Sequence, residues 1–384
     1  MRVGVIGLGA RIASMAGAFA RAEPGIRFAA VADPDDARMG ALTALGAAPE
    51  RYDDADAMLA ARDFDLLLVG SPNHLHLDHL RAALRSGTRW IFTEKPIVVS
   101  VAETLDLALL IARHDGARRM IVGLVLRYSA LYGALRDAQA AGWIGDVMSM
   151  EASEHIAPYH GSFFMRDWRR DGALSGGFML EKCCHDLDLY QSVAGARAMR
   201  VASFGGRKKY LPARRPATAP AYLTEMAPRW NGTADAFGGG GDIVDYQTAL
   251  VDYANGATLA FHTNLNVPDE FRRFCVVGTD GMAEGDFIRN HFRVTRSDDG
   301  ALLRDETALG TGAMKGHYGA DDRMAADVMA HIRGDLPALP LSVVDAMEAG
   351  VTAMAMDEAR REGRVVDLSE TWARMDDALT GRAA

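Results

Sequence analysis

The first 120 residues alternate short apolar segments with longer Ala- and Leu-rich stretches, and no other feature constrains the fold as much. Apolar side chains recur at three-to-four spacing within the longer stretches, as they do along one face of a helix. Strands that alternate with helices predict a parallel sheet with right-handed crossovers. We expect buried strands at residues 3–6, 27–32, 66–69, 90–93 and 120–122, and helices that include residues 12–22 and 78–86.

The pattern of apolar residues changes after about residue 145. Short segments of strand-like residues follow one another there, with turns such as Asn255-Gly256 between them, as hairpins require. This pattern predicts a second, mostly antiparallel sheet, with strands at residues 147–153, 245–253, 258–266, 273–278 and 292–296. Helical spacing returns at residues 321–333 and 342–362, whereas residues 205–242 are rich in Pro and Gly and are expected to be an irregular excursion.

A chain of 384 residues with this organisation is expected to form two domains. Residues 1–122 are predicted to form a doubly wound α/β domain with a parallel sheet. Residues 123–384 are predicted to form an α+β domain, whose large antiparallel sheet is flanked by helices and whose C-terminal helices pack back.

Charge and composition exclude several function classes. The formal net charge of −9 is the reverse of what a nucleic-acid-binding protein shows. No apolar segment reaches the length of a membrane span, and the chain starts directly with a predicted strand, so we expect a cytoplasmic protein without membrane contact. Three cysteines without a C-x-x-C spacing predict neither a zinc site nor a redox pair, and no metal is expected.

Residues 3–12, VGVIGLGARI, form a predicted strand, a glycine turn and the start of a helix. Gly7 permits the tight turn, Gly9 lets the backbone approach a pyrophosphate, and the helix start offers free N–H groups to the phosphates. Ile12 stands where a third glycine is usual, so we expect the helix to lie slightly further from the sheet. The segment predicts dinucleotide binding through Gly7, Gly9, Ala10, Arg11 and Ile12.

Asp33 ends the second predicted strand, about 24 residues after Gly9. An acidic residue at this place binds the ribose 2′-hydroxyl and repels a 2′-phosphate, which favours NAD. A plain turn residue before Pro34 is the alternative. Arg11 and Arg38 are basic residues that suit a 2′-phosphate, so NADP remains open.

Two further motifs follow predicted strands: Ser71-Pro72-Asn73-His74-Leu75-His76 and Thr93-Glu94-Lys95-Pro96. Ligands of open parallel sheets bind at the carboxyl ends of the strands, so both motifs are expected on the cofactor side. The predicted cofactor contacts here are Ser71, Asn73, His76, Glu94 and Lys95. His76 is expected in the cofactor pocket or at a helix entry, with a catalytic role as the alternative.

At these motifs the chain resembles the glucose–fructose oxidoreductase/inositol dehydrogenase/rhizopine catabolism (Gfo/Idh/MocA) family of oxidoreductases. That family shows a T/S-P-N-x-x-H segment followed by E-K-P. The resemblance continues over nearly the whole chain outside 205–242, at residues 123–128, 143–147, 176–188 and 278–281. It implies an N-terminal Rossmann domain, a nicotinamide cofactor, a sugar or polyol substrate, and a homodimer or homotetramer formed through the C-terminal sheet.

Lys95, Glu181 and His185 are the predicted catalytic residues. Oxidation of an alcohol needs a base, and His suits this role because its ordinary pKa lies near neutrality. A lysine holds the reacting oxygen as negative charge develops on it. On a continuous helix Glu181 and His185 would share one face. The family has a Lys–Asp–His set with His as the acid/base, so this chain departs from it in having Glu at position 181.

Further residues are expected around the substrate. Aromatic faces pack on a sugar ring while basic side chains donate to its hydroxyls. Lys182 is either a substrate contact or a solvated helix charge, and His317 either lies at the mouth of the site or belongs to a helix start capped by Asp321. Trp168 and Arg169 are expected to contact the cofactor or the sugar. The predicted substrate contacts are Lys95, Arg127, Tyr159, His160, Lys182, His185 and His317.

The sequence therefore predicts an NAD(P)-dependent dehydrogenase of a sugar, sugar derivative or cyclitol. One alternative is an enzyme that cleaves a glycoside through transient sugar oxidation by tightly bound NAD. The other is a non-catalytic dinucleotide-binding protein, which has no need of Lys95, Glu181 and His185 together.

Overall fold

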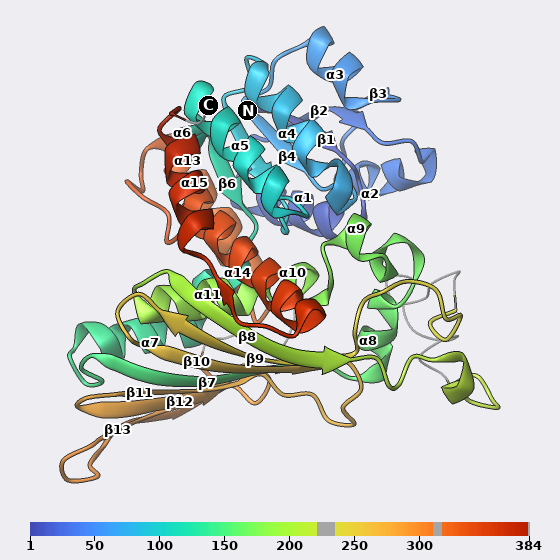
Figure 1. Ribbon diagram of the computed structural model, residues 1–384. Helices are drawn as coiled ribbons and strands as arrows, with labels where there is room; N and C mark the ends of the chain where they lie inside the picture. The colour runs from blue at the N-terminus through green and yellow to red at the C-terminus, as the bar shows by residue number, and fades with distance from the viewer. Residues whose placement is uncertain (221–234, 310–316, 383–384) are drawn as a thin grey trace. The chain divides into compact units, whose positions relative to one another are not determined.

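The computed structural model describes residues 1–220, 235–309 and 317–382. The chain forms two compact units (Figure 1). Unit 1 comprises Met1–Tyr128, Ala320–Val351 and Glu370–Ala384, and unit 2 comprises Ser129–Gly319 and Thr352–Ser369. The expected domain boundary between residues 122 and 123 stays a prediction.

Unit 1 contains a six-stranded parallel sheet with the strand order β3-β2-β1-β4-β5-β6. The chain adds strands in one direction from β1 and in the other direction from β4, so the switch point of this doubly wound sheet lies between these two strands. The strands are β1 (Arg2–Ile6), β2 (Arg27–Ala32), β3 (Glu50–Tyr52), β4 (Leu66–Val69), β5 (Trp90–Thr93) and β6 (Met120–Val122). All five predicted strands are confirmed, whereas the short β3 was not predicted.

Apolar helix faces cover the strands of unit 1. The four residues of β4 are fully buried, which explains why this strand has a continuous apolar sequence rather than an alternating one. Helix α13 packs beside α1. The helices are α1 (Ala10–Ala22), α2 (Gly40–Thr43), α3 (Ala55–Ala61), α4 (His76–Arg85), α5 (Val101–Arg113), α6 (Gly116–Arg119), α13 (Ala320–Arg333) and α15 (Ser369–Leu379), with α14 (Val343–Glu362) running through both units.

Unit 2 contains a nine-stranded sheet with the order β14-β13-β12-β11-β7-β10-β9-β8-β15. Among its described strands, β7 and β10 pair in parallel and the other neighbours pair antiparallel. The predicted α/β plus α+β fold is therefore confirmed. The strands are β7 (Val147–His155), β8 (Ala198–Gly206), β9 (Tyr246–Tyr253), β10 (Thr258–Asn264), β11 (Arg273–Gly278), β12 (Gly281–Asp286), β13 (His291–Arg296), β14 (Leu302–Thr307) and β15 (Val366–Asp367).

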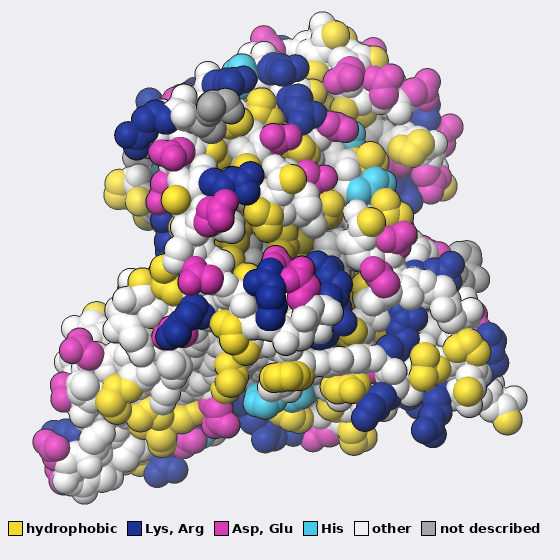
Figure 2. Space-filling view, viewed as in Figure 1, with side chains coloured by type: hydrophobic (Ala, Val, Ile, Leu, Met, Phe, Trp, Pro, Cys, Tyr) yellow, Lys and Arg dark blue, Asp and Glu magenta, His cyan; other side chains and the backbone are white. Residues whose placement is uncertain are grey.

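The two faces of this sheet differ. Gln247, Ala249 and Val251 of β9 are buried, whereas Leu250, which points the other way, is 55% exposed. Phe204 of β8 is 74% exposed. Hydrophobic side chains interrupt the charged surface over these strands in the space-filling view (Figure 2). The helices of unit 2 are α7 (Ala130–Ala140), α8 (Pro158–Phe164), α9 (Gly172–Ser175), α10 (Phe178–Glu181) and α11 (Cys184–Ala194).

The expected excursion at residues 205–242 is only partly described, because residues 221–234 lie outside the described residues. Its first two residues belong to β8. Its last residues dock on the segment around Arg170: the N–H of Asp242 donates to the carbonyl of Arg170 at 3.0 Å. A Cβ atom on Gly241, which has φ +83°, would lie 2.1 Å from the same carbonyl oxygen, so only glycine fits there.

Candidate active site

The glycine turn of unit 1 follows β1 and leads into α1. Gly7 has φ +75°, and a Cβ atom on it would lie 2.5 Å from the backbone of Ser71. Helix α1 begins directly after Gly9, so its first N–H groups and its positive dipole end face the turn. This arrangement fits the pyrophosphate of a dinucleotide, because no N-cap side chain bonds the first N–H groups of α1, and the close approach of Ser71 admits only glycine at position 7.

Ile12 occupies the third position of the glycine motif, and the room for it comes from Gly70. A Cβ atom on Gly70 would lie 2.7 Å from the Cβ atom of Ile12. Gly70 directly follows β4, so the glycine that permits close packing lies at the end of the neighbouring strand rather than on the helix. This finding explains the departure of the motif from its usual form.

Asp33 is 1% exposed and binds the glycine turn. Its Oδ2 accepts from the N–H of Leu8 at 2.6 Å and from Nη1 of Arg38 at 3.2 Å, and its Oδ1 accepts from the N–H of Asp35 at 2.8 Å. The carboxylate is therefore more than a turn residue, since it ties the end of β2 to the turn after β1. The ribose contact of Asp33 stays a prediction.

Arg11 connects the start of α1 to two carboxylates. Its Nε donates to Oε1 of Glu94 at 3.0 Å, and its Nη1 donates to Oδ2 of Asp321 at 2.8 Å. Glu94 belongs to the E-K-P segment after β5, and Asp321 to the first turn of α13. Arg11 thus fixes the residue next to Lys95.

His76 lies between the two motifs at the carboxyl ends of β4 and β5. Its Nδ1 is 2.7 Å from the carbonyl oxygen of Pro96, and its Nε2 is 2.9 Å from the carbonyl oxygen of Ser71. Burial lowers the pKa of His76 to about 4, although both carbonyl oxygens favour the charged ring. The peptide bond between Lys95 and Pro96 is cis. Since His76 is the first residue of α4, the structure gives it the helix-entry role as well as a place beside the E-K-P segment.

The segment of unit 2 that carries the predicted catalytic residues Glu181 and His185 is not one continuous helix. Gly176 and Gly177 have left-handed φ values of +84° and +87°, and the short helix α10 that follows ends at Glu181. Lys182 and Cys183 interrupt the helical conformation before α11 begins. The expectation that Glu181 and His185 share one face of a continuous helix is therefore wrong.

Glu181 lies close to a cation held by aromatic rings. Nε of Arg169 is 3.9 Å from Oε1 of Glu181. The guanidinium of Arg169 lies over the rings of Phe163 and Trp168, at 4.2 and 4.3 Å from their centroids. Two predicted site residues, Arg169 and Glu181, are thus brought together within unit 2, beside the aromatic side chains expected for a sugar pocket.

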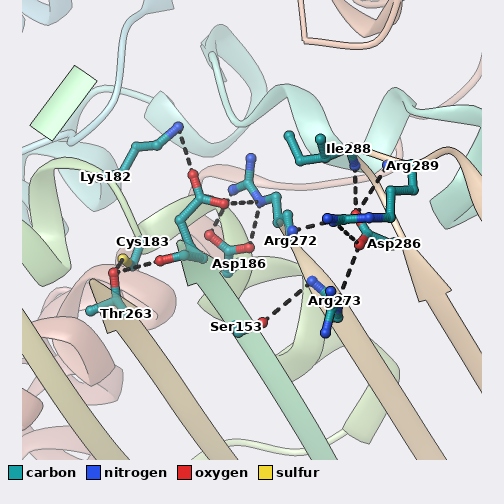
Figure 3. A network of polar contacts seen from close by, with 11 residues as sticks. Ser153, Lys182, Cys183, Asp186, Thr263, Arg272, Arg273, Asp286, Ile288 and Arg289 are labelled. Atoms are coloured by element: carbon teal, nitrogen blue, oxygen red, sulfur yellow. Dashed lines mark hydrogen bonds and ion pairs between the residues drawn. The ribbon is translucent and has the colours of Figure 1, made fainter. Parts of the chain in front are cut away.

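The interruption of the helix turns Lys182 inward. Its side chain is 11% exposed, and its Nζ lies 2.9 Å from Oε1 of Glu154 (Figure 3). Among the described residues, this carboxylate is the one acceptor that the ammonium contacts. The alternative of a solvated helix charge is therefore wrong, and the ammonium keeps N–H donors for a ligand.

Glu154 and Asp186 share the guanidinium of Arg272, which sequence reasoning missed. Nε of Arg272 lies 2.9 Å from Oε2 of Glu154 and 2.8 Å from Oδ1 of Asp186, and Nη2 lies 2.6 Å from Oδ2 of Asp186. Lys182, Glu154, Arg272 and Asp186 are called the buried ion network below. Its formal charges cancel.

The buried ion network explains the titration of its two carboxylates. Burial raises the pKa of Asp186. Burial acts in the same direction on Glu154, but the cations Arg272 and Lys182 outweigh it and hold the pKa of Glu154 below its ordinary value. One signal in the sequence pointed to this network: Glu154 falls at an inward-facing position of β7, where Met150 and Ala152 are apolar.

His185 is 2% exposed, and its ring lies near that of His317, with 5.6 Å between the ring centroids. His317 is left-handed at φ 49°, and the residues just before it, 310–316, lie outside the described part. Two predicted site residues that are 132 positions apart in the sequence thus lie next to each other in unit 2.

Three other predicted substrate contacts have structural partners. The hydroxyl of Tyr159 donates to Oε2 of Glu270 at 3.0 Å, and burial together with this carboxylate raises the pKa of Tyr159 to about 12. The ring of His160 stacks on that of Phe164. Arg127 belongs to unit 1, is buried, and donates to the carbonyl of Pro340 at 2.9 Å. Their roles toward a substrate stay predictions.

The described residues contain no group of His, Cys, Asp or Glu side chains suited to hold a metal ion. No helix in the described part of the chain is long and apolar enough to cross a bilayer.

Comparison with known protein families decides the identity of the two units. Residues 1–123 match the family model described as oxidoreductase family, NAD-binding Rossmann fold, and residues 132–284 match that of the GFO/IDH/MocA C-terminal domain. The chain belongs to the Gfo/Idh/MocA family of oxidoreductases. As a Gfo/Idh/MocA protein it is an NAD(P)-dependent dehydrogenase of the class that acts on CH–OH groups, and the predicted Rossmann domain and NAD cofactor are confirmed.

Relatives and solved structures extend the comparison. A putative oxidoreductase, YteT, of Bacillus subtilis (strain 168) is 23% identical over 360 residues, which cover 82% of this chain and 83% of that protein. The dTDP-3,4-didehydro-2,6-dideoxy-alpha-D-glucose 3-reductase of Streptomyces violaceoruber is 35% identical over 199 residues, about half of each chain. The scyllo-inositol dehydrogenase from Lactobacillus casei, solved with bound NAD(H) and scyllo-inositol, shares the fold with a TM-score of 0.73 and 19% identity, over 96% of this chain and 99% of that one.

Proposed function

We propose that this Gfo/Idh/MocA protein oxidises a secondary hydroxyl of a sugar, sugar derivative or cyclitol. The observation that carries the proposal is the place of His185, buried beside His317 on a segment held by the buried ion network. A base in such a place is protected from bulk water and held in one orientation. The Streptomyces relative is named as a reductase of a deoxysugar and the Lactobacillus structure as a dehydrogenase of a cyclitol, which supports this substrate class.

In this proposal the side chains of the two units have distinct roles. Lys95 holds the reacting hydroxyl oxygen and stabilises negative charge on it, and His185 takes the hydroxyl proton. Glu181 orients the imidazole or binds a neighbouring hydroxyl. Lys182 donates its remaining N–H groups to a second substrate oxygen. Bound NAD supplies the acceptor for the hydride.

The cofactor is proposed to lie along the carboxyl ends of β1, β2, β4 and β5. Gly7, Gly9 and the start of α1 would hold the pyrophosphate, and Asp33 the ribose. NAD is the proposed cofactor, because Asp33 is accompanied by Asp35 and Asp36, which would repel a 2′-phosphate. The remaining proposed contacts are Ala10, Arg11, Ile12, Ser71, Asn73, His76, Glu94, Trp168 and Arg169.

A second copy of the chain is proposed as the protein partner, in a homodimer or homotetramer formed through the C-terminal sheet. The face with Phe204 and Leu250 carries a hollow of about 640 Å³, whose lining includes Glu151, Arg200, Leu250, Asp252 and Val365. Exposed apolar side chains on one face of a sheet are typical of a contact surface.

A panel of sugars, inositols and glycosides tests the proposed function. Each compound is incubated with the protein and NAD or NADP, and reduced cofactor is followed by absorbance. We expect net reduction of NAD with at least one sugar or cyclitol, and no such activity in a His185→Gln variant. Cleavage of a glycoside without net reduced cofactor would contradict the proposal and favour the glycoside-cleaving alternative, which no observation above favours.

A further inference from the structure

Arg272 is a fully buried arginine that takes no part in the proposed proton and hydride transfer. Its side chain is 1% exposed and lies directly before β11. Besides Glu154 and Asp186, the guanidinium interacts electrostatically with the hydroxyl of Tyr318, whose pKa burial raises. Both side chains lie beside the ring of Phe287: the guanidinium is 5.9 Å and the ring of Tyr318 5.7 Å from its centroid. The guanidinium thus binds side chains from β7 and α11 (Figure 3), and Tyr318 brings the segment before α13 beside it.

Two of these partners directly follow the two histidines of the site. Asp186 follows His185, and Tyr318 follows His317. Because a side chain fixed at one residue restricts the backbone of its neighbour, the single guanidinium of Arg272 restrains both histidines. The rings of these histidines, 5.6 Å apart, belong to segments with no shared secondary structure.

The local backbone does not by itself fix the two histidines relative to each other. His185 lies in the first turn of α11, directly after the interruption at Lys182 and Cys183. His317 and Tyr318 have φ values of 49° and 63°, and non-glycine residues keep such values only where their surroundings enforce them. A side chain that contacts both segments, as Arg272 does, can join them.

Bidentate geometry makes arginine suited to this task. The two N–O distances from Arg272 to Asp186 are 2.8 and 2.6 Å, and a planar guanidinium fixes the carboxylate in angle as well as distance. A lysine keeps the charge but cannot bind Asp186 in two places while also reaching Glu154 and Tyr318.

We propose that Arg272 is a positioning residue that holds His185 and His317 in their mutual arrangement through Asp186 and Tyr318. This inference rests on the proposed function, in which His185 is the acid/base. It adds that the rate of the proton transfer depends on a side chain that touches neither substrate nor cofactor.

The test compares Arg272→Lys with the double variant Arg272→Met/Asp186→Asn. The double variant removes the clamp without leaving Asp186 as an unpaired buried charge, while Glu154 keeps Lys182 as its partner. Arg273→Met is the matched control, because Arg273 is adjacent in sequence, is 56% exposed and pairs with Asp286 instead. Thermal unfolding, NADH affinity, kcat, KM and the pH dependence of kcat/KM are measured on each full-length protein.

We expect Arg272→Lys and the double variant to fold and to bind NADH as the wild type does, with kcat lowered on the order of 10- to 100-fold, since a shift of about 1 Å in a catalytic group costs this much. The acidic limb of the pH profile should move, and the control should match the wild type in every measurement. A folded variant with kcat and pH profile within about twofold of wild type would overturn the proposal. Failure of both variants to fold would also overturn it, because Arg272 would then serve the core. If His185→Gln itself retained full activity, the proposed function would fail instead.

Discussion

Ile12 and Gly70 are packed so closely that a Cβ atom on Gly70 would lie 2.7 Å from that of Ile12. The third glycine of a dinucleotide-binding motif normally provides the space between helix and strand. Here the space comes from the strand side, since Gly70 follows β4 and Ile12 lies in α1. The close packing that the cofactor turn needs is kept by a glycine at another place in the sequence.

Gly70→Ala should therefore destabilise unit 1 by about 1–3 kcal/mol, the usual cost of overpacking a filled core, and should weaken NADH binding. Chemical unfolding and NADH titration measure both effects. The double variant Gly70→Ala/Ile12→Gly should recover part of the lost stability, because it removes the Cβ atom of residue 12 that a Cβ atom on residue 70 would meet. Gly40→Ala is the control, since a Cβ atom on Gly40 meets no neighbour within 4 Å. A Gly70→Ala protein as stable as that control would contradict the packing argument.

The sequence predicted most of the strands of unit 1 and its glycine turn, but not the packing between α1 and β4. Local signals placed the strands of unit 1 and the glycine turn, because each depends on residues that are neighbours in the chain. The replacement of the third glycine by Gly70 was not predicted, since it depends on a residue 58 positions away from Ile12 whose neighbour in space becomes known only with the fold.

Asp33→Asn should weaken NAD binding and narrow the preference for NAD over NADP. The carboxylate binds the N–H of Leu8 and the guanidinium of Arg38, and loss of its charge leaves Arg38 available to a 2′-phosphate. We expect Kd for NAD to rise on the order of 10-fold, as for the loss of one charge-assisted hydrogen bond. Isothermal titration with NAD and NADP measures it, and an unchanged ratio of the two affinities would contradict the assignment.

Stability should fall on acidification through the titration of His76. Burial holds the pKa of this imidazole at about 4, below the ordinary 6.5. Between these values the unfolded chain binds a proton that the folded chain does not, so the free energy of unfolding decreases as pH falls, by up to about 3 kcal/mol. Urea unfolding of wild type and His76→Gln over pH 6.5 to 4 should give a smaller slope for the variant. Equal slopes would show that another group is responsible.

The substrate side was predicted less completely. His185 and His317 came from the sequence, and the structure brings them together. The roles of Arg272 and Glu154 and the buried position of Lys182 were not predicted. For Lys182 the reason is that residue spacing does not distinguish a helix interrupted at this residue from a continuous one. A buried arginine between two carboxylates also has no local sequence signal, since its partners lie in distant strands and helices.

Charged residues on the open face of the nine-stranded sheet should dissociate the proposed oligomer. Phe204→Glu/Leu250→Glu changes two exposed apolar side chains on that face, and charges buried without partners at an interface are strongly unfavourable. We expect a monomer by sedimentation, with the circular dichroism spectrum unchanged. Leu302→Glu is the control, because it changes an exposed residue of β14 at the far end of the sheet. Phe163→Glu would not serve, because the ring of Phe163 lies under the guanidinium of Arg169. An unchanged oligomer in the double variant would place the contact elsewhere.

The most direct test of the central claim is the turnover of Lys95→Ala and His185→Ala with the best substrate of the panel, measured together with NADH affinity. General acid–base catalysis contributes typically 10²- to 10⁴-fold, so kcat should fall by about this factor in His185→Ala and by a similar factor in Lys95→Ala. NADH affinity should remain close to wild type for His185→Ala, because that residue belongs to unit 2 and the Rossmann sheet to unit 1. Near-wild-type kcat in both variants would contradict the assignment of Lys95 and His185 as the catalytic pair.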